Sequence, residues 1–209
     1  MKHSFAISCG LALSLLTPAL LFAQAPVLKV DLNTADRKEA EVNELGFTAW
    51  AIRPGDSDTR SLKGITITFT KKTTVGHLAA GYYKTAVQAP YYARLAGDGL
   101  VLDGGGSKAA VEMRISGLSA GPHTLLTYHN ILNASGKICS LNILVNGKLQ
   151  VTGLVPSRRA HENTACPTAY LHLNAQAGKD VVVLFETAPD AGASDNTIAI
   201  NGFELNTPD

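Results

Sequence analysis

Two stretches of alternating residues decide the fold class, Ile65-Thr66-Ile67-Thr68-Phe69-Thr70 and Val111-Glu112-Met113-Arg114-Ile115-Ser116. In each stretch the apolar side chains fall on one face of an extended strand and the polar side chains on the other. This alternation is typical of antiparallel strands that pack one face on a core and expose the other. Beyond the N-terminal leader, the sequence has no sustained 3.6-residue periodicity. It therefore predicts an all-β protein.

Nine further segments have the composition of strands, with turn residues between them. They are residues 28–32, 47–52, 92–95, 124–130, 139–145, 149–154, 170–173, 181–186 and 197–205. Their number and spacing predict an antiparallel β-sandwich of about ten strands, a jelly roll. The charged residues 33–45 predict either a short helical turn or a charged connector.

Two positions are expected to interrupt the regular strand pattern. Asn146-Gly147 is typical of a two-residue hairpin turn. A strict two-residue loop would put the apolar residues of 141–145 on the face of the polar residues of 148–152. An odd loop length or a bulge would instead align the apolar residues of the two strands. In the last strand the apolar positions change parity at Gly202, which predicts a bulge there.

Length and composition limit the classes of function. The chain has 209 residues, of which 45% are hydrophobic and 17% charged, and this suits one globular domain. The 18 basic and 17 acidic residues give a net charge of +1. Because the basic residues form no cluster, nucleic acid is not expected as a partner.

Residues 1–23 have the pattern of a secretory signal peptide. A short basic start, Met1-Lys2-His3, precedes an apolar run from Phe5 to Phe22, and cleavage is expected after Ala23. The run is short and contains a proline, so no transmembrane span is expected. The sequence thus predicts a single domain over residues 24–209 that is secreted into the periplasm or the extracellular space.

Two cysteines, Cys139 and Cys166, remain after removal of the leader. In an oxidising compartment they are expected to form one disulfide, worth about 3–4 kcal/mol in the chain-entropy model. Two separate buried thiols are the alternative.

Three stretches toward the C-terminus combine strand and turn signals. They are Gly117-Leu118 followed by Gly121-Pro122-His123-Thr124-Leu125-Leu126-Thr127-Tyr128-His129, then Leu141-Asn142-Ile143-Leu144-Val145-Asn146-Gly147, and finally Ile200-Asn201-Gly202-Phe203-Glu204-Leu205. Together they resemble malectin-like and galactose-binding-like carbohydrate-binding domains over residues 27–209. The resemblance implies a β-sandwich that binds a polysaccharide or oligosaccharide, of the type attached to secreted polysaccharide lyases and glycoside hydrolases. It also implies a structural calcium ion as the one metal to consider, and no other cofactor.

A tyrosine-rich region is the first candidate for ligand contacts. Gly81-Tyr82-Tyr83-Lys84 is followed by Pro90-Tyr91-Tyr92. Tyrosine rings pack against the C–H faces of sugars, while phenol hydroxyls and the Lys84 ammonium bond sugar hydroxyls. The alternative is that these tyrosines only cover the edge of the sandwich. Trp50, the one tryptophan, is expected in the core.

The loop at residues 155–167 is the second candidate. It holds Arg158, Arg159 and His161, and two guanidinium groups suit a planar carboxylate or a sulfate. This favours an acidic saccharide, while ordinary solvated arginines are the alternative. Asn130, at the end of its strand, is expected to line the same rim, whereas the neighbouring His129 is expected to be structural.

Catalytic motifs are weak in this sequence. The histidines have no metal-binding spacing, and there is no Gly-x-Ser-x-Gly nucleophile motif. The sequence therefore favours a non-catalytic carbohydrate-binding module, fused to or associated with a carbohydrate-active enzyme. The alternatives are a small polysaccharide lyase or glycoside hydrolase that acts on uronate-containing glycans through Arg159 and His161, and a cell-envelope protein-interaction module.

Overall fold

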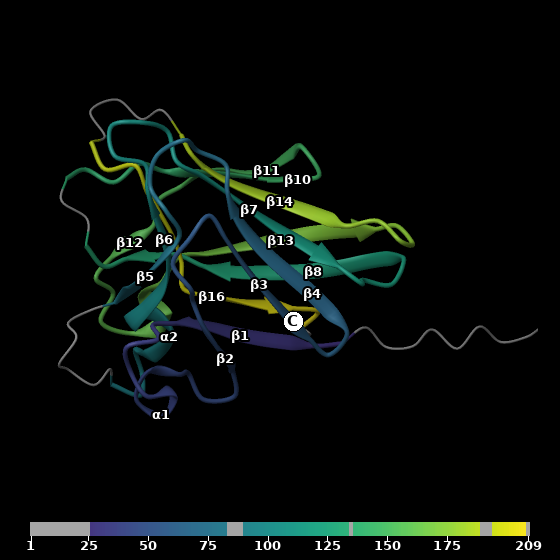
Figure 1. The fold of residues 1–209 in the computed structure, drawn as a ribbon, viewed down its shortest axis with the longest axis horizontal. Coiled ribbons are helices and arrows are strands. Elements are labelled where there is room, and N and C mark those ends of the chain that lie inside the picture. The colour runs from purple at the N-terminus through teal and green to yellow at the C-terminus, as the bar shows by residue number, and fades with distance from the viewer. Residues whose placement is uncertain (1–25, 83–89, 134–135, 189–193, 208–209) are drawn as a thin grey trace, which may run out of the picture.

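The computed structural model describes residues 26–82, 90–133, 136–188 and 194–207. Two large sheets face each other (Figure 1). The first has the strand order β13 (Thr168–Ala175), β8 (Gly121–Tyr128), β16 (Gly202–Leu205), β1 (Leu28–Asn33) and β2 (Thr48–Ala51). The second has the order β11 (Lys148–Leu154), β10 (Leu141–Val145), β14 (Val181–Thr187), β7 (Ala110–Ser116), β4 (Ile65–Lys71) and β3 (Ser57–Leu62). The leader predicted at residues 1–23 lies outside the described residues.

Smaller elements gather at one end of the sandwich (Figure 1). They are the sheet of β15 (Thr197–Ile200), β6 (Asp98–Asp103) and β5 (Ala79–Tyr82), the pair β12 (Ser157–Arg158) and β9 (Asn130–Ile131), and the short helices α1 (Glu39–Val42), α2 (Arg94–Gly97) and η1 (Asn163–Ala165). All described strand pairs are antiparallel except β1–β2 and β12–β9. The predicted all-β sandwich is confirmed, with extra short strands at this end.

The core forms where the apolar faces of the two large sheets meet. In β7 burial alternates as the sequence pattern predicted, with Val111, Met113 and Ile115 fully buried. Phe69 of β4 packs edge-on against Phe203 of β16, with ring centroids 6.4 Å apart, and so joins the two sheets. Trp50 is 2% exposed and belongs to the same core, as expected.

The strand predicted at residues 92–95 is wrong, because Arg94–Gly97 forms the helix α2. A short apolar run does not distinguish a buried strand from a buried helical turn by periodicity. The strands β3, β5 and β6 were not predicted. The sequence of β3 is polar and lacks the alternating apolar residues that indicate a strand. One of its polar residues, Asp58, is nevertheless 5% exposed and accepts a 3.1 Å bond from the Trp50 indole.

The hairpin between β10 and β11 has a two-residue turn together with a bulge. Val145 pairs directly with Lys148, and Asn146 and Gly147 both have positive φ, 48° and 79°. The register then shifts, so that Ile143 lies opposite Val151. The predicted bulge is therefore confirmed, while the odd loop length is not needed.

The parity change at Gly202 has a different cause from the predicted bulge. The chain leaves the small sheet at the end of β15 and joins the five-stranded sheet at the start of β16, with Asn201 between them. A Cβ atom on Gly202 would lie 2.6 Å from the Val30 carbonyl oxygen and 2.6 Å from Leu95 Cδ1. Gly202 is thus required by the close approach of β1 and α2.

The expected disulfide is not formed, and Cys139 and Cys166 are both buried thiols. Each thiol has its own surroundings. The Sγ of Cys139 lies 3.2 Å from Asn196 Oδ1. The Cys166 thiol lies by His129 and Ser157, and burial raises its pKa to about 12. The structure therefore has the alternative arrangement, two separate buried thiols.

Among the described residues, no helix is long and apolar enough to cross a membrane.

The close approach at Gly202 predicts a large loss of stability on addition of one methyl group. Gly202→Ala should lower the free energy of unfolding by about 2 kcal/mol or more, because backbone of β1 must move. Gly106→Ala is the matched control, since its Cβ would meet nothing within 4 Å. Urea unfolding of both variants measures this, and an equal effect of the two substitutions would contradict it.

Candidate functional site

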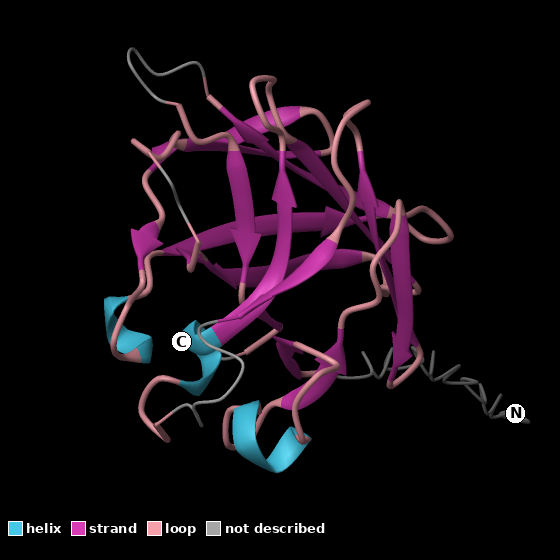
Figure 2. Cartoon of the chain, turned by 60° about the vertical axis from the view of Figure 1, so that its left-hand side comes forward, coloured by secondary structure: helices cyan, strands magenta, loops and turns pink. Residues whose placement is uncertain are grey.

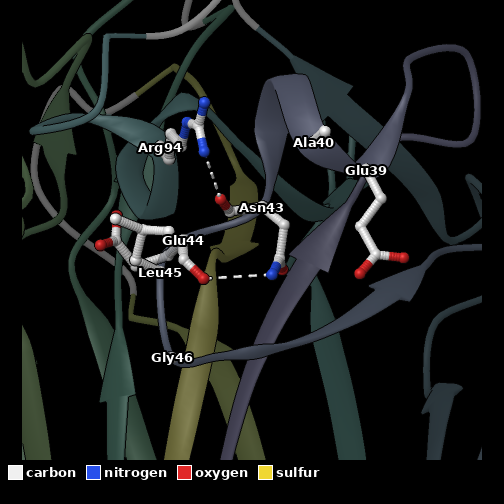
Figure 3. A pocket seen from close by; sticks show the side chains of 7 residues that line it. All are labelled: Glu39, Ala40, Asn43, Glu44, Leu45, Gly46 and Arg94. Carbon is white, nitrogen blue, oxygen red and sulfur yellow. Dashed lines mark hydrogen bonds between the residues drawn. The ribbon is translucent and has the colours of Figure 1, made fainter.

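The short helices lie together at one end of the sandwich (Figure 2). A hollow of about 350 Å³ lies between α1 and α2. We call it the rim pocket. It is lined by Glu39, Ala40, Asn43, Glu44, Leu45, Gly46 and Arg94 (Figure 3). The lining therefore joins α1 and the residues after it to α2, which are far apart in the sequence.

Arg94 connects the pocket to the tyrosine region. It is only 3% exposed, and its Nη1 donates to the Asn43 carbonyl at 3.2 Å. Its guanidinium lies over the Tyr91 ring, 4.0 Å from the centroid, a cation–π contact. Tyr91 itself is 64% exposed. Its ring is therefore contacted by Arg94 and is otherwise largely open to solvent.

Glu44 connects the pocket to the loop at residues 155–167. Its Oε2 accepts a 2.6 Å bond from the Asn163 amide, and its backbone N–H donates to Asp31 Oδ2 at 2.6 Å. The Asn163 backbone N–H in turn donates to the Tyr92 carbonyl at 2.8 Å. These bonds hold three chain segments around the pocket in one arrangement.

The tyrosines predicted as a platform lie at this end of the sandwich. Tyr82 ends β5 and pairs with Asp98, while Tyr91 and Tyr92 precede α2 and are 64% and 66% exposed. Tyr83 and Lys84 lie outside the described residues. The structure thus brings Tyr91 beside the rim pocket through Arg94, and ties Tyr92 to the loop through Asn163.

The predicted basic loop does not line the rim pocket. Arg158 pairs with Ile131 in the β12–β9 ladder. Arg159 has φ 52°, and its Nε donates to the Leu132 carbonyl at 3.0 Å. His161 is exposed. Neither Arg158 nor Arg159, the two arginines on which an acidic ligand was predicted, is among the residues that line the hollow.

Asn130 is fully buried and all its amide atoms are bonded. Its Oδ1 accepts from the Ser157 hydroxyl and the Ala160 N–H, both at 2.9 Å, and its Nδ2 donates to the Ala96 carbonyl at 2.7 Å. The side chain therefore positions the loop and α2 under the rim rather than facing solvent.

Two buried carboxyl groups lie beneath the pocket. Asp31 and Asp98 are 0% and 1% exposed. Burial raises the pKa of Asp98 to about 7, and burial together with the charge of Asp98 raises the pKa of Asp31 well above its usual value. Asn33 lies between them, with its Nδ2 3.5 Å from Asp98 Oδ1. This acid pair is covered by the Asn43–Glu44 backbone.

His129 is structural, as predicted. It is fully buried, and burial lowers its pKa to about 4. Because Nδ1 lies 2.9 Å from the Ala199 carbonyl, that nitrogen carries the proton, and Nε2 accepts from the Thr127 hydroxyl at 2.8 Å.

The described residues contain no group of three or more His, Cys, Asp or Glu side chains that could hold a metal ion. The oxygen-richest place is the acid pair, where Asp31 Oδ1 and Asn33 Oδ1 are buried without a partner. Two carboxylates are fewer than a calcium ion usually takes, since it prefers six to eight oxygen ligands. A structural calcium ion stays a prediction from the resemblance.

A second hollow, of about 450 Å³, lies on the outer face of the six-stranded sheet. Its charged residues compensate one another, because Lys72 pairs with Glu112 at 3.5 Å and Lys108 with Glu186 at 2.9 Å. None of its lining residues is aromatic. The rim pocket has no aromatic lining residue either, but Arg94 holds Tyr91 beside it, and Glu39 and Glu44 form no salt bridge among the described residues. It is therefore the better candidate for a ligand site.

The lining residues of the rim pocket were not found from the sequence. The Arg94–Asn43 and Asn163–Glu44 bonds span 51 and 119 residues. Local spacing carries no signal for such contacts. The charged residues 33–45 were the one available hint, and they do contain the short helix α1.

No protein-family model matches the chain, and no curated protein matches its sequence. Among solved structures, it is similar to a CBM35 module of Paenibacillus barcinonensis, with 12% identity and a TM-score of 0.37 over 74% of this chain and 100% of that chain. It is similar to a Bacteroides uniformis beta-glucuronidase, with 12% identity and a TM-score of 0.48 over 88% of this chain and 18% of that chain.

A third likeness is to a chain in the complex of the plant peptide RALF23 with FER and LLG2. It has 11% identity and a TM-score of 0.50, over 87% of this chain and 49% of that chain. At this identity the likeness shows the fold alone. The β-sandwich that the sequence resemblance implied is confirmed as a fold, and its galactose-binding-like character stays a prediction.

The acid pair predicts a pH-dependent stability. The native pKa of Asp98, about 7, lies above the value of about 3.9 in an unfolded chain. The native state therefore holds a proton that the unfolded state releases, and the stability due to this proton is lost as the pH rises through 7. Asp98→Asn removes the titration and keeps an amide oxygen that can accept from Asn33 Nδ2.

Urea unfolding of both proteins at pH 5, 6, 7 and 8 measures the effect. The stability of the natural protein relative to Asp98→Asn should fall as the pH rises, because His129 is common to both and the charge of Asp98 raises the pKa of Asp31 in the natural protein alone. A difference that stays constant from pH 5 to 8 would contradict the raised pKa.

Proposed function

We propose that the protein binds a saccharide at the rim pocket without transforming it. The observation that carries the proposal is the exposed Tyr91 ring, fixed by Arg94 at the edge of a polar hollow. Fold alone does not give function, since one fold hosts many sites. The argument therefore rests on the residues of the pocket.

The Tyr91 ring supplies a stacking surface. An aromatic face is electron-rich and attracts the polarised C–H groups of a sugar ring. The Arg94 contact at 4.0 Å holds one side of the ring, and the 64% exposure of Tyr91 leaves surface for a ligand. A ring that is already held in place loses little conformational entropy on binding.

The pocket supplies polar groups for sugar hydroxyls. Glu39 and Glu44 present carboxylate oxygens, which accept hydrogen bonds from hydroxyl groups. Leu45 is 69% exposed at the same wall and adds apolar surface. Apolar surface with a few polar groups is typical of small-ligand sites.

Three groups with strongly shifted pKa values lie out of reach of a ligand. Asp31, Asp98 and His129 are each 0–1% exposed, so no substrate atom can reach their side chains. A general acid or base must lie within hydrogen-bonding distance of the proton that it transfers. The proposal therefore includes no reaction and no cofactor.

The leader at residues 1–23 supports a secreted protein that meets polysaccharides outside the cytoplasm. An open pocket with one fixed aromatic ring predicts weak binding at a single site. Such binding gains strength through multivalent contact or through a fused or associated carbohydrate-active enzyme.

Removal of the Tyr91 ring tests the site. Tyr91→Ala should weaken saccharide binding about tenfold or more, which corresponds to about 1.4 kcal/mol. Tyr170→Ala is the matched control, because Tyr170 is also exposed, 41%, but belongs to the outer face of β13. Affinity electrophoresis through gels with neutral, acidic and amino polysaccharides measures binding, with product assays on the same mixtures.

Retardation that Tyr91→Ala abolishes and Tyr170→Ala preserves is the expected result. Equal retardation of all three proteins would place the ligand elsewhere. Product release would replace the binding proposal with an enzyme, and no retardation on any gel would overturn it.

A further inference from the structure

We infer that the rim pocket prefers a saccharide unit with a free amino group, a hexosamine, over a neutral unit, and that it disfavours a uronic acid. This inference rests on the proposed function and names the ligand class of the same site. It differs from the acidic saccharide that Arg158 and Arg159 predicted from the sequence.

The first step concerns charge. Glu39 and Glu44 line the pocket, and neither forms a salt bridge within the described part of the chain. The glutamates Glu41, Glu112 and Glu204, in contrast, each pair with a Lys or Arg side chain. The lining thus holds two carboxylates without a salt bridge among the described residues.

The second step concerns Arg94, the one cation among the lining residues. Its side chain is 3% exposed, its Nη1 is bonded to the Asn43 carbonyl, and its face is stacked on Tyr91. Its Nε is buried, so a ligand carboxylate cannot reach it to form paired bonds with Nε and an Nη atom. Arg94 supplies one positive charge to the lining, against the two carboxylates of Glu39 and Glu44.

The third step concerns hydrogen bonding. The Asn43 Nδ2 donates to the Glu44 and Phe47 carbonyls, at 3.1 and 2.8 Å, so both of its hydrogens are used, and Oδ1 is buried. The carboxylate oxygens of Glu39 and Glu44 only accept hydrogen bonds. An ammonium group has three donors and no acceptor, a hydroxyl can donate one bond, and a carboxylate donates none. The expected affinity is therefore highest for a saccharide with an amino group, lower for a neutral saccharide and lowest for an acidic one.

Figure 3 shows how the two carboxylates are presented, with Glu39 and Glu44 on opposite sides of Asn43. The Asn163 amide that bonds Glu44 is neutral, so it orients the carboxylate without removing its charge. Two carboxylates against one guanidinium give the lining a net negative charge, which attracts a cationic group and repels a uronate.

The test compares three oligosaccharides of equal length by isothermal titration calorimetry on the full chain. They are a glucosamine oligomer with free amines, a neutral glucose oligomer and a galacturonate oligomer. The glucosamine oligomer should bind about tenfold tighter than the glucose oligomer, and the galacturonate oligomer weakest of the three. The preference should shrink as salt is raised, because salt screens exposed charges.

Glu39→Gln should lower the ratio of glucosamine to glucose affinity several-fold. Glu41→Gln is the matched control, since Glu41 is on the same helix but pairs with Arg37 and does not line the pocket. Its ratio should equal that of the natural protein.

The outcomes separate the two proposals. Equal binding of the amine and neutral oligomers, tighter binding of galacturonate, or an unchanged ratio in Glu39→Gln would overturn the inference and leave the saccharide site standing. Binding of none of the three oligomers would overturn the proposed function, and the inference with it.

Discussion

Two buried asparagine amides hold together the end of the sandwich on which the site is built. Asn201 lies where the chain passes from the small sheet to the five-stranded sheet, and its Oδ1 accepts a 2.6 Å bond from the Asn130 N–H while its Nδ2 donates to the Asp98 carbonyl at 2.6 Å. The Asn130 amide continues the network to α2 and to the loop after β12. Because a buried amide without partners is costly, these segments can adopt only positions that satisfy every bond.

The rim pocket follows from this constraint. With α2 fixed from below, Arg94 reaches the Asn43 carbonyl and the Tyr91 ring, and Asn163 reaches Glu44. The acid pair beneath the pocket has a cost in the native state, since burial disfavours charge on Asp31 and Asp98. The same arrangement places Glu39 and Glu44 in the lining of the pocket. Their negative charge is the basis for the proposed preference for an amino sugar.

The strands of the two large sheets could mostly be predicted, because burial on one face imposes a period of two that local sequence records. Residues 65–70 and 111–116 show it directly. The region of the site could not be predicted in the same way. Residues 92–95 have the composition of a strand although α2 begins within them, and β3 is polar because it lies at a sheet edge. The pocket depends on the Arg94–Asn43 and Asn163–Glu44 contacts, whose partners are separated by 51 and 119 positions in the sequence. The tyrosines could be proposed as ligand contacts from their residue type, because an aromatic ring can stack on a sugar. Arg94 and Glu44 could not, because their place at the site depends on contacts with residues far away in the sequence.

The central claim is that a saccharide occupies the rim pocket rather than the hollow on the six-stranded sheet. Mapping of backbone amide chemical shifts during titration with a glucosamine oligomer tests it most directly. The account predicts the largest shifts at Asn43, Glu44, Tyr91 and Arg94, with little change at Glu112 and Leu184. Shifts centred on Glu112 and Leu184, with the rim unaffected, would contradict it.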